Sequence, residues 1–221
     1  MTRIGFEHQL EELKDDMLTL GSMVEKAVIK AVDALKRRDF DTSQRIIEED
    51  AMINHKRYEI EETCLRLLAT QQPMAGDLRT IISVLHITVD LERMADHAAG
   101  IAKISLLIGD DPLIKPLIDI PRMAELVLDM LRRSLDSFIN LDVALAKQVC
   151  RDDDEVDDLH DQVYRDLLNI MLEDPGTINQ ATYLTWVAHN LERIADRSTN
   201  ISERAAFTAT GKLEDIGAST Y

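Results

Sequence analysis

The stretch LERMADHAAGIAK, residues 91–103, decides the fold, because the chain repeats it one hundred positions later as LERIADRSTNISE, residues 191–203. Five of the first seven residues are identical in the two stretches: Leu, Glu, Arg, Ala and Asp. An internal repeat of this kind indicates that the chain is built from two copies of one structural unit.

Apolar residues recur every three or four positions through most of the chain, which is the spacing of one face of an α-helix. In the first half, this spacing predicts helices over about 6–38, 41–70 and 74–108. The pattern returns about 103 positions later and predicts three more helices, the last over about 177–206. The sequence therefore predicts an all-α protein of two tandem antiparallel three-helix bundles related by an internal repeat.

The strongest interruption of this pattern is GDDPLIKPLIDIP, residues 109–121, which contains three prolines and one glycine. Proline and glycine at this density break helices, so the segment is expected to link the two units. The first unit then covers residues 1–108 and the second covers residues 122–207. A short polar tail, residues 208–221, follows.

The turns between the first two helices of each unit also correspond. Arg38-Asp39-Phe40 in the first unit matches Leu141-Asp142-Val143 in the second. Aspartate is a preferred N-cap residue, so either Asp39 or Asp41 is expected to cap the second helix.

Charge and composition narrow the classes of function. The formal net charge of −16 disfavours nucleic acid and anionic lipid as direct partners, because both are negatively charged. No stretch approaches the ~20 apolar residues of a membrane span, so no membrane insertion is expected. Cys64 and Cys150 lack a Cys-x-x-Cys spacing and suggest free thiols in a reducing compartment. These features favour a cytoplasmic protein.

The repeated stretch carries the first candidate ligands. Glu92 and Asp96 lie one helical turn apart on one face, away from the centre of the apolar stripe. Glu192 and Asp196 repeat this arrangement, and Asn200 offers a further oxygen ligand in the second unit.

The second helix of each unit carries a matching set. Asp50 and Asn54 are one turn apart, as are Asp153 and Asp157, and His160 lies on the same face as the latter pair. Side-chain oxygens from two adjacent helices can converge on a cation. Such oxygen-rich sites suit Mg, Mn, Ca, Fe or Zn, so a metal site is expected in each unit.

Other interpretations of these acids remain open. Acid pairs also arise by chance on the solvated faces of a chain with 41 acidic residues. Arg93 and Arg193 can instead neutralise the neighbouring acids through salt bridges. His86, His97 and His189 are expected to be core or surface residues. No phosphate-binding loop, dinucleotide fingerprint or His-Glu-x-x-His motif is present, so the chain is not expected to be an enzyme.

The chain resembles the PhoU family of phosphate-signalling regulators. The resemblance rests on the two LERxAD motifs, on QQPMAGDLR at residues 71–79, and on the repeated three-helix pattern, and it covers residues 7–207. It implies paired three-helix bundles, often dimeric, some of which carry multinuclear iron or zinc clusters. The resemblance further implies that the cluster ligands come from a Glu/Asp-x-x-x-Asp motif, which matches Glu92/Asp96 and Glu192/Asp196 here.

The resemblance also implies a function. Family members damp the phosphate-starvation response when phosphate is plentiful, by bridging the ATPase of the phosphate ABC transporter and a sensor histidine kinase. The expected function is therefore a cytoplasmic adaptor and negative regulator that forms a homodimer. A metal-dependent enzyme that uses the same carboxylates and a purely structural oligomerising bundle are the alternatives.

The chain departs from the family pattern at three positions. Ala95 and Ala195 precede the motif aspartates where the family usually has glycine, and Gly100 replaces the first of two asparagines. The second metal site is therefore more strongly expected than the first.

Overall fold

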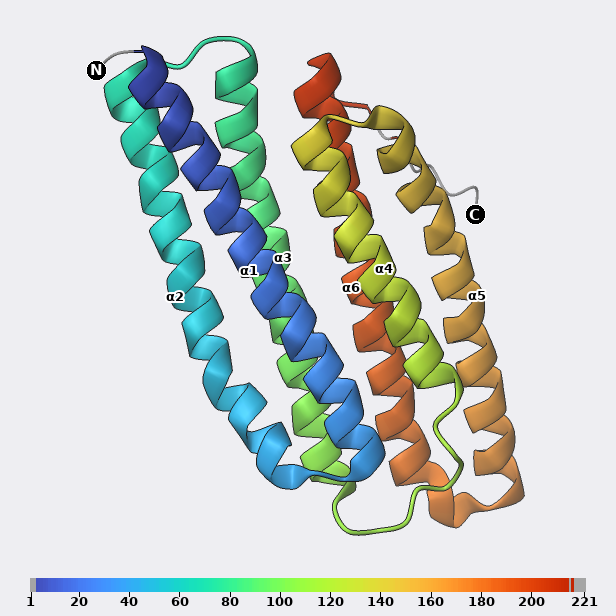
Figure 1. The fold of residues 1–221 in the computed structure, drawn as a ribbon. Helices are drawn as coiled ribbons and strands as arrows, with labels where there is room; N and C mark the ends of the chain where they lie inside the picture. The colour runs from blue at the N-terminus through green and yellow to red at the C-terminus, as the bar shows by residue number, and fades with distance from the viewer. Residues whose placement is uncertain (1–2, 215, 217–221) are drawn as a thin grey trace.

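Long helices make up nearly all of the protein in the computed structural model, which describes residues 3–214 and 216 (Figure 1). They are α1 (Arg3–Arg37), α2 (Phe40–Gln71), α3 (Gly76–Ile108), α4 (Asp119–Asn140), α5 (Val143–Glu173) and α6 (Ile178–Thr210), with a one-turn 3-10 helix, η1 (Pro175–Thr177), before α6. The described residues contain no strand, and the expected all-α architecture is confirmed. None of the described helices has both the length and the apolar character to span a membrane.

Two helix ends in the second unit differ from expectation. The last helix continues past residue 206 to Thr210, because Thr208 is buried and its hydroxyl donates a hydrogen bond to Ser83 Oγ of α3 (2.7 Å). At the other end of the unit, α4 already begins at Asp119, inside the segment expected to be a linker. Pro121 falls in its first turn, where its missing N–H is not needed. Of the expected tail, residues 215 and 217–221 lie outside the described residues.

The two α–α turns are built alike. Asp39 Oδ1 accepts a hydrogen bond from the Thr42 amide (2.9 Å), so Asp39 rather than Asp41 caps α2. In the second unit, Asp142 caps α5 by accepting from two backbone amides. The residues just before these caps, Arg38 and Leu141, both have left-handed backbone, with φ of 56° and 52°. The sequence correspondence of the turns therefore extends to their geometry.

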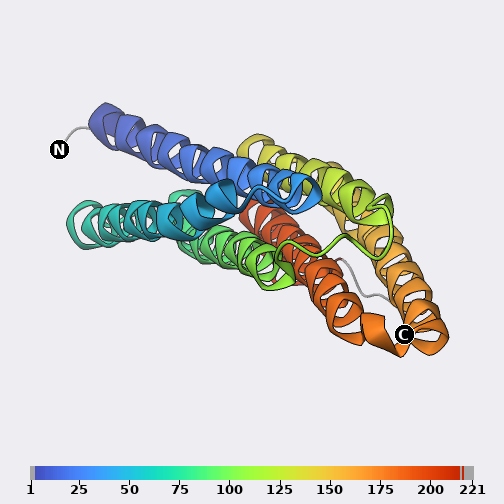
Figure 2. The ribbon, with the colours of Figure 1, turned by 90° about the horizontal axis from the view of Figure 1, so that it is seen from below.

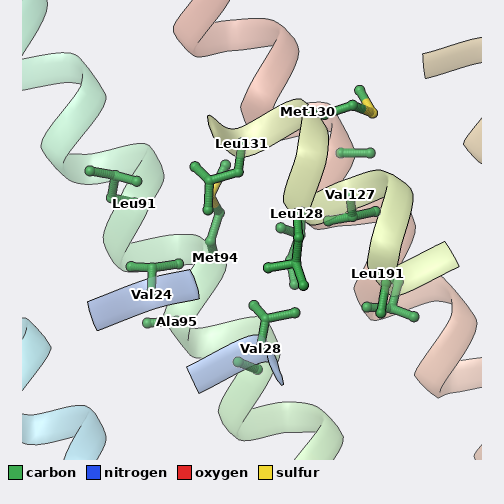
Figure 3. Close-up of a cluster of buried hydrophobic side chains, with 14 of the residues drawn as sticks. Val24, Val28, Leu91, Met94, Ala95, Val127, Leu128, Met130, Leu131 and Leu191 are labelled. Carbon is green, nitrogen blue, oxygen red and sulfur yellow. The ribbon is translucent and has the colours of Figure 1, made fainter. Parts of the chain in front are cut away.

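The two units pack side by side (Figures 1 and 2). Helix α3 lies against α6 and α1 against α4, which leaves α2 and α5 on the two outer sides. One continuous hydrophobic core runs through both units. Figure 3 shows part of this core, where Val24 and Val28 of α1 and Met94 of α3 lie near Leu128 and Leu131 of α4. The six helices therefore form one body with a shared interior.

Candidate functional site

In the first unit, α2 and α3 bring four of the predicted ligands together. The Asn54 amide donates a hydrogen bond to Asp50 Oδ2 (3.0 Å). Burial, followed by repulsion from Asp96, raises the pKa of Asp50 above its usual value. The same two causes, in the same order, raise the pKa of Glu92. The three carboxylates therefore lie close enough between α2 and α3 to oppose one another's ionisation.

The second unit forms the equivalent cluster between α5 and α6. Burial raises the pKa of Asp153 to about 7, and repulsion from Asp157 and then Asp196 adds to the effect. The pKa of Asp157 is also raised, first by burial and then by repulsion from Glu192. This cluster has four carboxylates, because Asp157 stands where the first unit has Asn54.

Two histidines border the second cluster. The rings of His160 and His189 lie 6.2 Å apart between their centroids. His189 Nδ1 is 2.9 Å from Glu192 Oε2, and His160 slightly lowers the pKa of Asp157 through its charge. The structure thus places His160 beside the predicted acids. It also places His189 of α6 beside the cluster. The sequence pattern treated His189 as a core or surface residue, because helical spacing does not show which part of α6 meets α5.

Both clusters contain buried carboxylate oxygens that lack a hydrogen-bond partner among the described residues: Asp50 Oδ1, Glu92 Oε2, Asp153 Oδ1 and Glu192 Oε2. Two of these atoms do lie near cationic side chains without a hydrogen bond: Glu92 Oε2 is 3.5 Å from Arg93 Nε, and Glu192 Oε2 is 3.7 Å from Arg193 Nε and 2.9 Å from His189 Nδ1. A buried anionic oxygen without a partner is costly, and such groups in proteins are normally paired or coordinated to a cation. The same two positions carry this feature in both units, which argues for a shared role.

Arginine is the cation now next to the motif acids. Arg93 Nη1 lies 3.0 Å from Asp96, and Arg193 Nη1 lies 2.8 Å from Asp196. The side chains of both arginines are about half exposed (54% and 47%), so each pair contributes little stability. The two arginines therefore do pair with the motif acids, as the alternative interpretation expects, but these pairs are solvent-exposed and weak.

The donor chemistry of the two clusters fits a hard or borderline metal ion, since it is dominated by carboxylate oxygens. Within residues 3–214 and 216, however, no three His, Cys, Asp or Glu side chains converge closely enough to hold a metal as they stand. Ligation would therefore require the side chains to move, with the exposed arginines giving way.

Asn200 lies on a different side of α6 from the acid cluster. Its amide donates a hydrogen bond to Asp90 of α3 (3.4 Å), across the contact between the units. The equivalent position in the first unit, Gly100, faces Asn190 of α6, and a Cβ there would lie only 2.9 Å from Asn190 Oδ1. Positions 100 and 200 therefore both serve the contact between the units.

A further pair of polar contacts joins the units and was missed by sequence reasoning. Arg197 lies 3.3 Å from Asp90, and His97 Nδ1 lies 2.9 Å from Asn190. These four residues occupy two equivalent positions of the repeat, one hundred residues apart. The hundred-residue offset between these positions was visible in the sequence, but it does not show which helix faces meet.

Comparison with known proteins gives a consistent result. The family model described as PhoU domain matches residues 17–105 and 120–205. The chain is 40% identical over 217 residues to the phosphate-specific transport system accessory protein PhoU homolog of Clostridium acetobutylicum, covering 98% of this chain and 99% of that protein. It is 39% identical to the protein of the same name from Aquifex aeolicus, with 93% of each chain covered.

Solved structures agree with these matches. The crystal structure of the phosphate transport system regulatory protein PhoU from Streptococcus pneumoniae superposes with a TM-score of 0.88 at 34% identity, covering 95% of this chain and 99% of that one. PhoU from Pseudomonas aeruginosa gives the same score and identity, covering 94% and 100%. These names are those of accessory and regulatory proteins, in agreement with the expectation that the chain is not an enzyme. The chain belongs to the PhoU family, with one copy of the PhoU domain in each of its two units.

Proposed function

We propose that this chain is an accessory regulator of phosphate uptake that binds metal ions at its two acid clusters. The regulatory part is supported by the near full-length similarity to accessory and regulatory PhoU proteins of phosphate transport. The metal-binding part is supported by one observation, the buried carboxylate oxygens at equivalent positions of both units that accept no hydrogen bond from any described residue.

The first metal site would use Asp50, Glu92 and Asp96, with Asn54 as a neutral oxygen donor. The second would use Asp153, Asp157, Glu192 and Asp196, with His160 at its edge. The carboxylates of each site would hold Fe or Zn, or alternatively Mg, Mn or Ca, whose positive charge would offset their mutual repulsion. Each site would thereby join an outer helix to an inner one, α2 to α3 and α5 to α6.

The proposed regulator acts as a cytoplasmic adaptor, as a homodimer, between the ATPase of the phosphate ABC transporter and a sensor histidine kinase. Its net charge of −16 favours encounter with basic faces of partner proteins, because complementary charge speeds association. The long outer faces of α2 and α5 offer extended surfaces for such contacts.

Metal retention tests the sites directly. Wild-type protein, loaded with Zn²⁺ or Mn²⁺ and passed through a desalting column, is expected to retain metal measured by mass spectrometry. Asp153→Asn with Asp157→Asn should lose the retained metal of the second unit. A matched control, Asp154→Asn with Asp158→Asn, changes two exposed acids one turn apart on the same helix and should retain it. Equal retention by all three proteins would refute the site.

A transcriptional reporter tests the regulatory role. In phosphate-rich cells, deletion of this gene should switch on a phosphate-starvation reporter, and the wild-type gene should silence it again. A variant with Glu92, Asp96, Glu192 and Asp196 all changed to Ala, shown to be folded by circular dichroism, is then expressed in the deletion strain. If this variant fails to silence the reporter, the four acids are needed for regulation. An unchanged reporter in the deletion strain would contradict the proposed function, whatever the metal result.

A further inference from the structure

The outer face of α5 combines an acidic stretch with an apolar stripe. The acidic stretch, residues 152–161, holds seven acidic side chains and neither lysine nor arginine. The apolar stripe follows it along the helix and consists of Tyr164, Leu168 and Leu172, spaced one turn apart and 50%, 39% and 74% exposed. Helix α5 lies on the outer side of the second unit and packs, among the described elements, only against α4, α6 and η1 (Figure 1). No other described element therefore covers this face.

Two acids of the stretch are free to meet a partner. Asp154 and Asp158 are exposed, one turn apart, and make no ion pair with any residue that the structure describes. Asp153 and Asp157 belong instead to the second acid cluster. The other three acids are paired with arginines, and these pairs are Asp152–Arg133, Glu155–Arg122 and Asp161–Arg165. Arg165, the one basic residue in the rest of α5 beyond the stretch, is thus already paired.

The first unit does not share this face. At the repeat offset of 103 residues, the acidic stretch corresponds to residues 49–58, which carry two acidic and two basic side chains. The apolar stripe Tyr164, Leu168 and Leu172 corresponds to Glu61, Leu65 and Ala69. Glu61 is paired with Arg57 (2.8 Å), so Leu65 is the one large apolar side chain of the three. Unpaired acids next to an apolar stripe are therefore a property of α5 and not of the repeat.

Charge argues against a second copy of the chain as the partner on this face. Two α5 faces laid together would set Asp154 and Asp158 either against the same acids or against the leucines of the other copy. The first arrangement opposes like charges, and the second buries carboxylates without a partner, so both are unfavourable. A partner with basic side chains avoids both.

We propose that the outer face of α5 docks an amphipathic helix of a partner protein, one half of which is basic and the other half apolar. Basic side chains of that helix pair with Asp154 and Asp158, and its apolar side chains cover Leu168 and Leu172. Residues 154–172 span about 27 Å, which is the length of a helix of about 18 residues. The proposal rests on the proposed adaptor role for the existence of a partner protein, and it gives that role a surface and a partner chemistry.

The second metal site adjoins this face but uses different acids. Its proposed ligands on α5 are Asp153 and Asp157, each next in the chain to one of the exposed acids. Docking therefore does not require bound metal, although metal would reduce the negative potential that attracts a basic helix. Binding is accordingly measured on metal-free protein in chelator.

The test uses the full chain with ¹³C-labelled leucine methyl groups. The probe is an alanine-based helical peptide of matching length, with leucines on one face of its N-terminal half and lysines on the same face of its C-terminal half. It matches α5 in the antiparallel direction. We expect it to shift the signals of Leu168 and Leu172, while that of Leu65 stays in place. Control peptides with Ala for each Leu, or Glu for each Lys, should cause no such shift.

Two double variants separate the halves of the face. Leu168→Ala with Leu172→Ala changes exposed side chains only, and should weaken peptide binding at least about tenfold, as loss of anchor residues does. Leu65→Ala is its matched control at the equivalent position of the first unit and should bind as the wild type does. Asp154→Asn with Asp158→Asn should weaken binding about fivefold and reduce its dependence on salt.

Several outcomes would overturn the proposal. These are unmoved Leu168 and Leu172 signals at millimolar peptide, wild-type affinity in either double variant, or preference for the Glu peptide. Shifts produced by protein concentration alone would also overturn it, because a second copy would then be the occupant. If the peptide fails to bind while the starvation reporter responds to gene deletion, the docking face falls and the regulatory role stands. A reporter that ignores deletion while the peptide binds would have the opposite meaning.

Discussion

The two units share a scaffold but differ in what they enclose. Both place acids from an outer and an inner helix together, and in both, equivalent carboxylate oxygens accept no hydrogen bond from the described residues. The second unit has a fourth carboxylate, Asp157, where the first has Asn54. The first unit has a pocket between α1 and α2 whose lining includes Ala27, and the buried Met130 stands at the equivalent position of the second unit. The repeat therefore determines the helices, while a few substitutions on their facing sides determine what each unit can bind.

The largest expected effect on stability comes from substitutions in the hydrophobic core that the two units share. Leu91 and Leu191 are equivalent and both fully buried. Leu91→Ala and Leu191→Ala should each lower the free energy of unfolding by ~2–5 kcal/mol, through lost contacts and a cavity. Because one core spans both units, either change should shift a single transition in urea. Fluorescence of Trp186, the one tryptophan, reports on the second unit, and far-UV circular dichroism reports on both. A fluorescence midpoint unmoved by Leu91→Ala would mean that the units unfold separately.

The extra carboxylate of the second unit should have an intermediate effect. The folded pKa of Asp153 is about 7, above its unfolded value near 4, so the folded state holds an extra proton between these pH values. Metal-free protein should therefore lose stability as pH rises from about 4 to about 7. Asp157→Asn copies the first unit, removes the main repulsion, and should raise the free energy of unfolding at pH 8 by ~1 kcal/mol. Urea unfolding in chelator across this pH range measures both effects.

Asp158→Asn is the matched control for this comparison, because Asp158 is an exposed acid on the same helix. It should leave the pH slope largely unchanged. A slope that is the same in the wild type and in Asp157→Asn would show that the two carboxylates do not oppose each other's ionisation.

The two α–α turns should give the smallest effect. Leu141 and Arg38 both adopt the left-handed conformation that glycine tolerates best. Leu141→Gly should stabilise the protein by ~0.5 kcal/mol, measured by thermal unfolding. Arg38→Gly should gain less, because Arg38 Nη1 also donates hydrogen bonds to the carbonyls of Asp110 and Asp111. Leu141→Ala, which keeps the strain, separates the backbone effect from side-chain loss. Stabilisation by alanine equal to that by glycine would contradict the backbone explanation.

The sequence predicted the helices well because their signal is local and is repeated. Apolar spacing and the duplicated motif were sufficient for the helix order. Asp39 was one of two candidate caps, and Asp142 was recognised only as part of the corresponding turn. The end of α6 was not predicted, because Thr208 is held by a contact with Ser83, which is distant in sequence. Polar composition alone favoured a tail there.

The candidate site was predictable only in part for a related reason. Helical spacing shows which side chains share a face, so it grouped Glu192 with Asp196 correctly. It does not show which neighbouring helix that face meets. An inner helix such as α6 has neighbours on several sides, and Asn200 meets α3 rather than α5. The missing information was the packing arrangement of the units, which only the three-dimensional structure supplies.

The polar contacts between α3 and α6 have a consequence for the symmetry of the molecule. Position 90 meets position 200, and position 190 meets position 100, so each unit offers the other the same patch of surface. This reciprocity is the mark of an isologous contact between identical subunits. The molecule thus has the internal plan of a symmetric dimer whose two half-length units are joined in one polypeptide. The symmetry is confined to this contact, because the outer helices differ: α5 carries Asp157 where α2 carries Asn54.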